Sequence, residues 1–293
     1  MEIEYKSVRS LETIASDACE RIVADDCKIN FLLAYELPTQ DLVRNVLLDV
    51  KEKAQQWAAD ECPDNLYFNH GQYKVGGIEN IIKELKEKSS SNRALYSLID
   101  QKTIMDSGDN PIPSFMIFQS ILDNGTLYCN VYLRALEVSK FLRINLEEIR
   151  INIEKIAQSS LSFSKVRLVI FACRAHHVPN FNPLEKPKLD LMTQYQIMRV
   201  MNEDRHEFVR YLQKMAEVHT VMSSKSIKHI QELVEGEWQG DNKARLLSLL
   251  GMTISLIDEL VELRKQHSHD ERVSSLGVEI SEKLRTLAEE FLK

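Results

Sequence analysis

The chain changes character after the prolines at Pro183 and Pro187. From Met192 to the last residue the sequence contains no proline and has the pattern of successive helices. Proline interrupts helices because it has no amide hydrogen and its ring clashes with the preceding turn, so a long proline-free stretch can stay helical. We therefore expect two domains, one over residues 1–191 and an all-helical interaction domain over residues 192–293.

The first part of the chain alternates between helical and strand patterns. The apolar spacing predicts helices at 11–23, 41–59, 78–85 and 145–159, and strands at 29–35, 94–99 and 166–173. Two more strands flank a turn at Asp123, Asn124 and Gly125, which we expect to sit in a slightly longer loop. This mixture predicts an α+β fold.

The second part carries a heptad-like seam, in which apolar residues recur in steps of three and four. Its members are Leu246, Leu249, Thr253, Leu256, Leu260, Leu263, Val273, Leu276, Ile280, Leu284, Leu287 and Phe291. Such a seam fits an antiparallel helical bundle folded on itself, which we favour, or a coiled coil that pairs with another chain.

Composition excludes several classes of protein. The 37 basic and 44 acidic side chains give a net charge of −7, which argues against nonspecific nucleic-acid binding. No apolar run approaches the roughly 20 residues that a membrane span needs, and the N-terminus MEIEYKSVRS lacks an apolar signal core. The five cysteines and eight histidines show no metal-ligand spacing. We expect a cytoplasmic protein without a metal site or a membrane segment.

Four blocks of sequence stand in an informative order: HGQYKVGGIENIIKELKEKSSSNRALYSL, PSFMIFQ, YLRALEVSKFLRIN and FACRAHHVPN. Together they resemble the thymidylate synthase family over about residues 67–190. The resemblance implies a thymidylate-synthase-like layered sheet with helices, a pyrimidine nucleotide as ligand, and a homodimer or higher oligomer. Nothing beyond residue 192 resembles that family.

The resemblance assigns phosphate and base contacts. Arg93 and Arg134 match arginines that bind the nucleotide phosphate, Arg93 from across the dimer, and a guanidinium offers phosphate a planar fork of donors. Asn145 follows Arg134 at the spacing of the asparagine that reads the pyrimidine edge, where an amide both donates and accepts.

The same resemblance assigns three further positions. His176 matches a histidine that binds the nucleotide sugar, and Asn180 completes the same Ala-His-x-x-x-Asn pattern. Glu137 stands where the family has an aspartate that helps to position the base.

Several positions depart from the family pattern. Ser114 replaces the cysteine whose thiolate attacks C6 of the pyrimidine in that family. A cysteine thiol has a pKa of about 8.5 and readily forms a nucleophilic thiolate, whereas a serine hydroxyl does not. The other replacements are Phe115 for histidine, Ala135 for serine, Val178 and His70 for tyrosines, and Arg174 for aspartate. Cys173 is the nearest other thiol, and we expect it to be a buried packing residue. The family's folate-closing tail is replaced by helices, so we expect no folate cofactor.

Three functions remain open. We favour a protein that binds a pyrimidine nucleoside phosphate without methyl transfer and acts as a sensor or assembly scaffold through its helical tail, which would meet a protein partner. A second possibility is an enzyme with altered chemistry on a pyrimidine nucleotide, such as base modification or hydrolysis with Glu137 or His176. A third is a structural interaction protein with a vestigial pocket and surface arginines.

Overall fold

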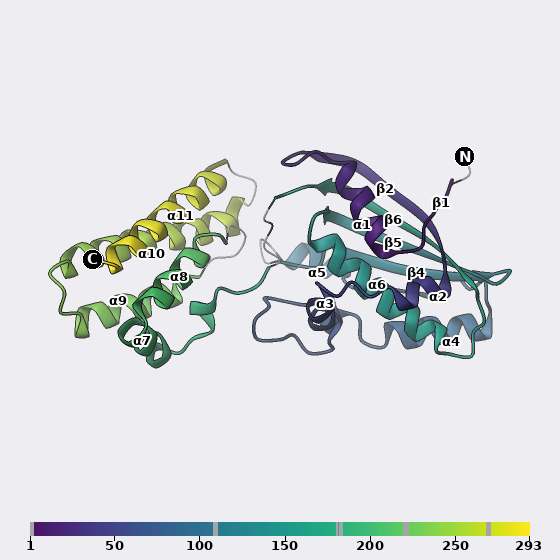
Figure 1. Ribbon diagram of the computed structural model, residues 1–293, viewed down its shortest axis with the longest axis horizontal. Coiled ribbons are helices and arrows are strands. Elements are labelled where there is room, and N and C mark those ends of the chain that lie inside the picture. Colours follow the sequence, from purple (N-terminus) through teal and green to yellow (C-terminus); the bar gives the residue numbers. More distant parts are fainter. Residues whose placement is uncertain (1–2, 108–110, 180, 182–183, 219–222, 268–270) are drawn as a thin grey trace. The chain divides into compact units, whose positions relative to one another are not determined.

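The computed structural model describes residues 3–107, 111–179, 181, 184–218, 223–267 and 271–293. The chain divides into two compact units (Figure 1). Unit 1 comprises Met1–Pro63, Phe68–Asp106 and Ile112–Pro183, and unit 2 comprises Asp64–Tyr67, Ser107–Pro111 and Leu184–Lys293. Unit 2 thus starts before residue 192 and takes in short segments from the first half of the sequence.

Unit 1 is built on a mixed sheet with the order β1-β2-β6-β5-β4-β3 in the described part of the chain. The strands are β1 (Lys6–Ser7), β2 (Cys27–Pro38), β3 (Leu95–Ser97), β4 (Phe115–Asp123), β5 (Thr126–Glu137) and β6 (Lys165–His176). The central strands β5 and β6 run parallel and are joined by the long helix α6 (Phe141–Ala157). Strands β2 and β4 pair antiparallel on either side of them. The fold is therefore α+β, as predicted.

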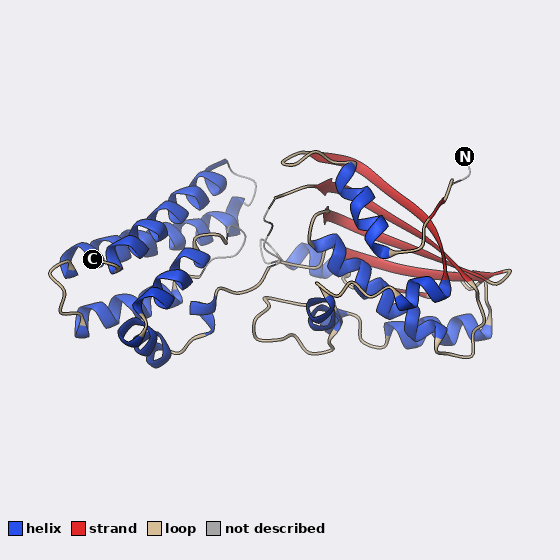
Figure 2. Ribbon diagram, viewed as in Figure 1, coloured by secondary structure: helices blue, strands red, loops and turns tan. Residues whose placement is uncertain are grey.

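Helices of unit 1 gather on one face of this sheet (Figure 2). They are α1 (Leu11–Glu20), α2 (Thr39–Arg44), α3 (Lys51–Ala58), α4 (Gly77–Glu87) and α6, and two smaller elements are the turn Gly71–Tyr73 and the exposed α5 (Gln101–Asp106). On β2 the alternate residues Phe31, Leu33 and Tyr35 are buried toward these helices, because successive strand side chains point to opposite faces. On the opposite face Leu32 is 42% exposed.

Two predicted elements differ from the structure. The single helix expected over 41–59 is two helices, α2 and α3. The break is stabilised locally by the Asn45 amide, which donates to the Asp41 carbonyl, and through a tertiary contact by the Leu47 N–H, which donates to the buried Glu147 carboxylate. The loop expected between β4 and β5 is only the two-residue turn Asn124-Gly125, and both residues have positive φ.

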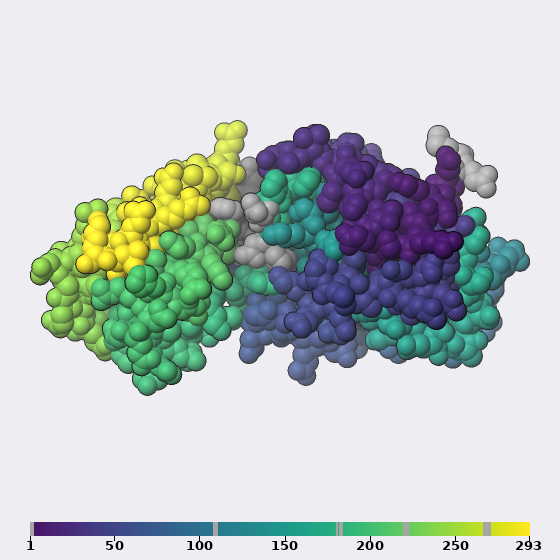
Figure 3. Space-filling view, in the orientation of Figure 1, coloured from purple at the N-terminus to yellow at the C-terminus, as the bar shows by residue number. Residues whose placement is uncertain are grey.

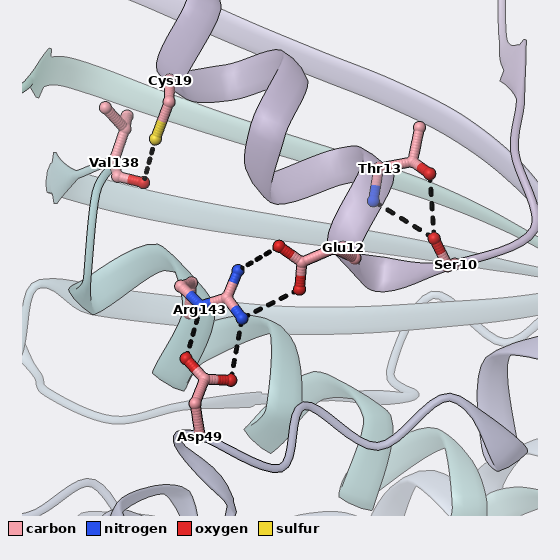
Figure 4. Close-up of polar contacts among 7 residues, drawn as sticks. All are labelled: Ser10, Glu12, Thr13, Cys19, Asp49, Val138 and Arg143. Carbon is pink, nitrogen blue, oxygen red and sulfur yellow. Dashed lines mark hydrogen bonds and ion pairs between the residues drawn. The ribbon is translucent and has the colours of Figure 1, made fainter.

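One arginine fixes the start of α6 against two other segments (Figure 4). The Arg143 guanidinium donates to both oxygens of Glu12 in α1 and to both oxygens of Asp49, at 2.7–2.9 Å. Nearby, the Cys19 thiol of α1 donates to the Val138 carbonyl at 3.2 Å. The first turn of α6 is therefore anchored from both sides.

Unit 2 is helical, with one short turn at Lys188–Leu191. Its helices are α7 (Gln194–Glu203), α8 (Arg205–Met215), α9 (Lys225–Glu237), α10 (Lys243–His267) and α11 (Glu271–Phe291). In the space-filling view α11, in yellow, lies along α8, in green (Figure 3). The Phe291 ring contacts Phe208 and Trp238 with centroid distances of 4.9 and 5.4 Å.

The residues of the heptad-like seam pack against other helices of the same chain. Seam residues such as Leu246, Leu260, Leu276 and Leu284 are buried in the core that these helices share. This arrangement is the helical bundle folded on itself that we favoured. None of the described helices is both long and apolar enough to cross a membrane.

Candidate functional site

A buried histidine and a buried glutamate form a hydrogen-bonded pair under the sheet. His70 is 2% exposed, and its Nδ1 lies 2.9 Å from the Glu148 carboxylate of α6. Its ring packs against Trp57 and Phe115, with centroid distances of 4.8 and 5.6 Å, and 6.2 Å from Phe141. The other ring nitrogen, Nε2, is buried and has no partner among the described residues.

Asn145 lies on the same stripe of α6. It is four residues after Phe141 and three before Glu148, and residues at these spacings are neighbours on a helix surface. Both flanking residues contact His70, so Asn145 belongs to the same cluster. Asn145 is 1% exposed, and its Oδ1 is also buried without a partner in the described structure.

More polar side chains continue this stripe away from Phe141. Asn152, four residues beyond Glu148, donates to the Tyr96 hydroxyl at 3.0 Å, and the Lys74 ammonium donates to the Asn152 oxygen at 3.5 Å. Burial lowers the pKa of Lys74, although the nearby Glu148 carboxylate acts in the opposite direction. Burial also raises the pKa of Tyr96 well above its usual value. The polar groups at the Asn152 end of the cluster therefore have hydrogen-bond partners, whereas His70 Nε2 and Asn145 Oδ1 have none among the described residues.

A surface pocket lies at the ends of three neighbouring strands. Near these ends the burial of every second residue is shifted by one position on two adjacent strands. The buried residue that follows Leu133 on β5 is Leu136, and the one that follows Ala172 on β6 is Ala175. On β2, Asn30 takes up a positive φ at the same level. Arg174, two residues after Ala172, would lie on the buried face in a regular strand. Because of the shift it does not.

This pocket has a volume of about 450 Å³. It is lined by Asp25, Asp26, Cys27, Ala135, Arg174, His176, His177 and Val178. Burial and the Arg174 charge lower the pKa of His176, so this imidazole is neutral near pH 7 despite the opposing Glu137 charge. With two aspartates beside one arginine, the pocket is mixed in charge rather than strongly basic.

Phe181 connects the pocket to the buried cluster. Its ring lies 6.4 Å from the His176 ring and 6.2 Å from the Phe141 ring, measured between centroids. His176 therefore comes near the group that contains His70 and Asn145, although these residues are far apart in sequence.

Ser114 and Arg134 are joined through the backbone. The Arg134 amide donates to the Ser114 carbonyl at 2.9 Å, and Ser114 precedes Phe115, which packs on His70. The Arg134 guanidinium donates to the carbonyls of Ile112 and Pro113, and no described carboxylate pairs with it. Partial burial lowers the pKa of Arg134 below its ordinary value, yet the group stays charged near neutral pH.

Arg93 lies elsewhere in the same chain. It is exposed in the loop before β3, where the Ala94 carbonyl accepts a hydrogen bond from Ser120 of β4. Ser114 is next to the other end of β4, about 20 Å away at the usual rise of roughly 3.3 Å per residue. Within one chain Arg93 does not join the cluster.

Glu137 has a structural task. Its two carboxylate oxygens accept hydrogen bonds from the backbone N–H groups of Ser139, Lys140 and Phe141 and from the Ser139 hydroxyl, at 2.6–3.0 Å. It therefore caps the start of α6, where helix N–H groups lack partners. These bonds leave it poorly placed as an acid or base. Asn180 lies outside the described residues.

The structure corrects one thiol and adds residues that sequence reasoning missed. Cys173 is exposed and does not line the pocket, contrary to the buried thiol that we expected. Glu148 was missed, although a charged residue three positions after Asn145 shares its face of the predicted helix and is a signal for it. Asp25 and Asp26 were missed because they lie in a turn without a motif.

A comparison with known protein families and with curated proteins finds no match to this chain. Among the described residues, no group of three His, Cys, Asp or Glu side chains is placed to hold a metal ion.

Proposed function

We propose that unit 1 is a degenerate thymidylate-synthase-like domain that binds a pyrimidine nucleoside phosphate without methyl transfer. The observation that carries this proposal is Asn145, whose buried Oδ1 has no hydrogen-bond partner in the described part of the chain. A buried polar atom without a hydrogen bond costs about 1–3 kcal/mol, so such an atom is expected to face a ligand or water. Asn145 is also the residue that the family resemblance assigns to the pyrimidine edge.

Two arginines support a phosphate-bearing ligand. Arg134 carries a charge that no described carboxylate neutralises, and it is hydrogen-bonded to the chain beside Ser114. Arg174 lines the pocket near His176. The mixed charge of that pocket favours a ligand with a single phosphate over a ligand with a longer, more highly charged chain of phosphates.

Methyl transfer does not belong to the proposal. Ser114 stands at the position of the attacking thiolate, and Phe115 beside it offers no base to activate a hydroxyl. Binding without turnover fits a sensor or scaffold, in which the helical unit 2 meets a protein partner. Tyr195 of α7 and Val278 of α11 are exposed apolar side chains on the surface of unit 2.

Isothermal titration calorimetry with dUMP, dCMP, UMP and dTMP tests the binding step. We expect at least one of them to bind, and Arg134→Ala to weaken it about tenfold or more because a charge-assisted phosphate contact is lost. Arg210→Ala, an exposed arginine of α8, is the matched control and should leave affinity unchanged. If no nucleotide binds, or if Arg134→Ala binds as well as wild type, the proposal is wrong. Mass spectrometry of the recovered ligand should find it unaltered.

A further inference from the structure

A thiol, an imidazole and a carboxylate stand in one row across three neighbouring strands. Cys27 of β2 is paired with His176 of β6, and His176 is paired with Glu137 of β5. Paired residues on adjacent strands project their side chains from the same face of a sheet. Cys27 and His176 also line the same pocket of about 450 Å³. The pocket therefore holds a nucleophile beside a group that can accept its proton.

Cys27 and His176 form the closer of the two kinds of antiparallel pair. The adjacent pair is hydrogen-bonded, because the His177 N–H donates to the Asp26 carbonyl at 3.1 Å. The two kinds alternate along the strands, so Cys27 and His176 are a non-hydrogen-bonded pair, whose Cα atoms lie about 4.5 Å apart. Neither side chain has a hydrogen-bond partner among the described residues. In enzymes the contact between such groups commonly tightens only when a substrate is bound.

The His176 imidazole is in the form that can accept a proton. Burial lowers its pKa, the Glu137 charge opposes this and the Arg174 charge adds to it, so the ring is neutral near pH 7. Once the ring has taken a proton, the Glu137 carboxylate stabilises the imidazolium. Arg174 lines the pocket too, and none of the described carboxylates pairs with it.

The remaining titratable groups of the pocket are Asp25, Asp26 and His177. Asp26 Oδ1 accepts the Cys27 N–H at 2.7 Å, so this carboxylate is engaged with the backbone. His177 Nδ1 lies 3.0 Å from the Ile22 carbonyl, to which it donates. His177 is thus held by the backbone, whereas His176 is the imidazole that pairs directly with Cys27.

We infer that Cys27 is a nucleophilic thiol with His176 as its base, and that the pocket directs it at small anionic electrophiles. This inference goes beyond nucleotide binding and does not depend on it. Cys27 Sγ forms a bond to an electrophilic carbon, the leaving group departs with its electron pair, and the thiol hydrogen passes to a ring nitrogen of His176. The Arg174 guanidinium attracts the negative charge of the electrophile.

Alkylation of the wild-type full chain with iodoacetamide tests the nucleophile. Cys173, which is exposed but does not line the pocket, is the internal reference, and mass spectrometry of the tryptic peptides 22–28 and 168–174 gives the two rates separately. An unassisted thiol reacts about tenfold more slowly for each pH unit below about 8.5. With a neutral base beside it Cys27 should slow less, so we expect the ratio of the Cys27 rate to the Cys173 rate to rise at least about fivefold from about pH 8.5 to about pH 6.5.

A variant then identifies the base. His176→Gln keeps a polar side chain at this half-buried position but accepts no proton, so the rise in the ratio at low pH should disappear. A purely structural effect would change the Cys27 rate by the same factor at every pH. His206→Ala, an exposed histidine of α8, is the control and should keep the wild-type profile.

A second reagent tests the preference for negative charge. Iodoacetate alkylates by the same chemistry as iodoacetamide but carries a carboxylate. In Arg174→Gln the ratio of the iodoacetate rate to the iodoacetamide rate at Cys27 should fall about fivefold, because the attracting charge is lost. Arg210→Ala, an exposed arginine of α8, should leave this ratio unchanged.

Each part of the inference has its own contrary outcome. A ratio of Cys27 to Cys173 rates that is constant with pH overturns the assisted nucleophile. An unaltered pH profile in His176→Gln overturns the role of His176 as the base. An unaltered ratio of the two reagents in Arg174→Gln overturns the preference for anionic electrophiles. None of these measurements uses a nucleotide, so nucleotide binding stands or falls separately.

Discussion

At the scale of single residues, Glu137 shows how a side chain at a binding-site position can serve the fold. Its carboxylate closes the open end of α6 by accepting three backbone hydrogens. We predict that Glu137→Ala lowers the free energy of unfolding by about 2–3 kcal/mol, more than an ordinary cap because a carboxylate bonds more strongly. Urea denaturation measures this. The exposed Glu20→Ala should change stability by less than about 0.5 kcal/mol, and equal effects of the two changes would contradict the assigned role.

The sequence predicted these residues unevenly. Asn145 and His176 were singled out from their motifs, and the structure brings both near His70, Asn145 along α6 and His176 through Phe181. Glu137 was given a site role because its motif position says nothing about where its oxygens find partners. Glu148 was missed because a lone glutamate on a helix is usually solvent-exposed, and only the contact with His70 from a distant segment shows otherwise.

At the scale of elements, Arg143 binds α6 to α1 and to the segment before α3. Its hydrogen bonds stabilise the ionised forms of Glu12 and Asp49, which lowers the pKa of both carboxyl groups. The contribution to stability is therefore complete above the ordinary pKa values and is lost as the pH falls through the lowered ones. Both carboxylates are more than half exposed, so solvent screening limits the total to the order of 1 kcal/mol.

We predict that Arg143→Ala is less stable than wild type at pH 7 and that the difference shrinks steadily below about pH 4.5, near the ordinary carboxyl values. Thermal denaturation across this range measures the difference. Arg199→Ala, which breaks an exposed pair with Glu203 on one helix, should cost less at pH 7. A difference in stability that stays constant down to pH 2 would mean that Arg143 stabilises the fold through packing alone and not through its ion pairs.

Helices and strands could be predicted to the extent that their periodicity is local. Apolar spacing predicted strands β2 to β6 of unit 1 and the all-helical character of unit 2, but not the two-residue strand β1. The interruption between α2 and α3 does not, because it depends on Glu147, a residue about a hundred positions away that accepts the Leu47 N–H. The order of strands in the sheet likewise depends on pairings that no local pattern contains.

At the scale of the whole molecule, the sheet of unit 1 leaves a partly apolar face without helices. On β2, Leu32 and Ile29 are 42% and 63% exposed on this face. On the strands between β2 and β4, the ring of Tyr132 stacks on that of Phe171. Four neighbouring strands, spaced about 4.8 Å apart and some 30–40 Å long, present roughly 600–700 Å² per chain, close to the roughly 800 Å² of a standard interface. We propose a second copy of the chain as the occupant.

We predict a dimer that Leu32→Arg converts to monomer, because the substitution places a charge in the buried interface. Sedimentation equilibrium measures the mass. Val278→Glu, on the exposed side of α11, should leave the dimer intact. A monomeric wild type would rule out the dimer, and a dimer that only Val278→Glu dissociates would place the contact on α11 instead of on the sheet.

The segment Asp64–Tyr67 belongs to unit 2 although both of its chain neighbours belong to unit 1. It is held by Glu185 and Lys186, since Leu66 pairs with Glu185 and the Lys186 N–H donates to Asn65. Two residues further on, the Asn69 amide donates to the carbonyls of Gln56, Ala59 and Glu61, directly before His70. Asn69 therefore ties the chain directly before His70 to three carbonyls of unit 1, so the backbone at the imidazole is fixed within unit 1 itself.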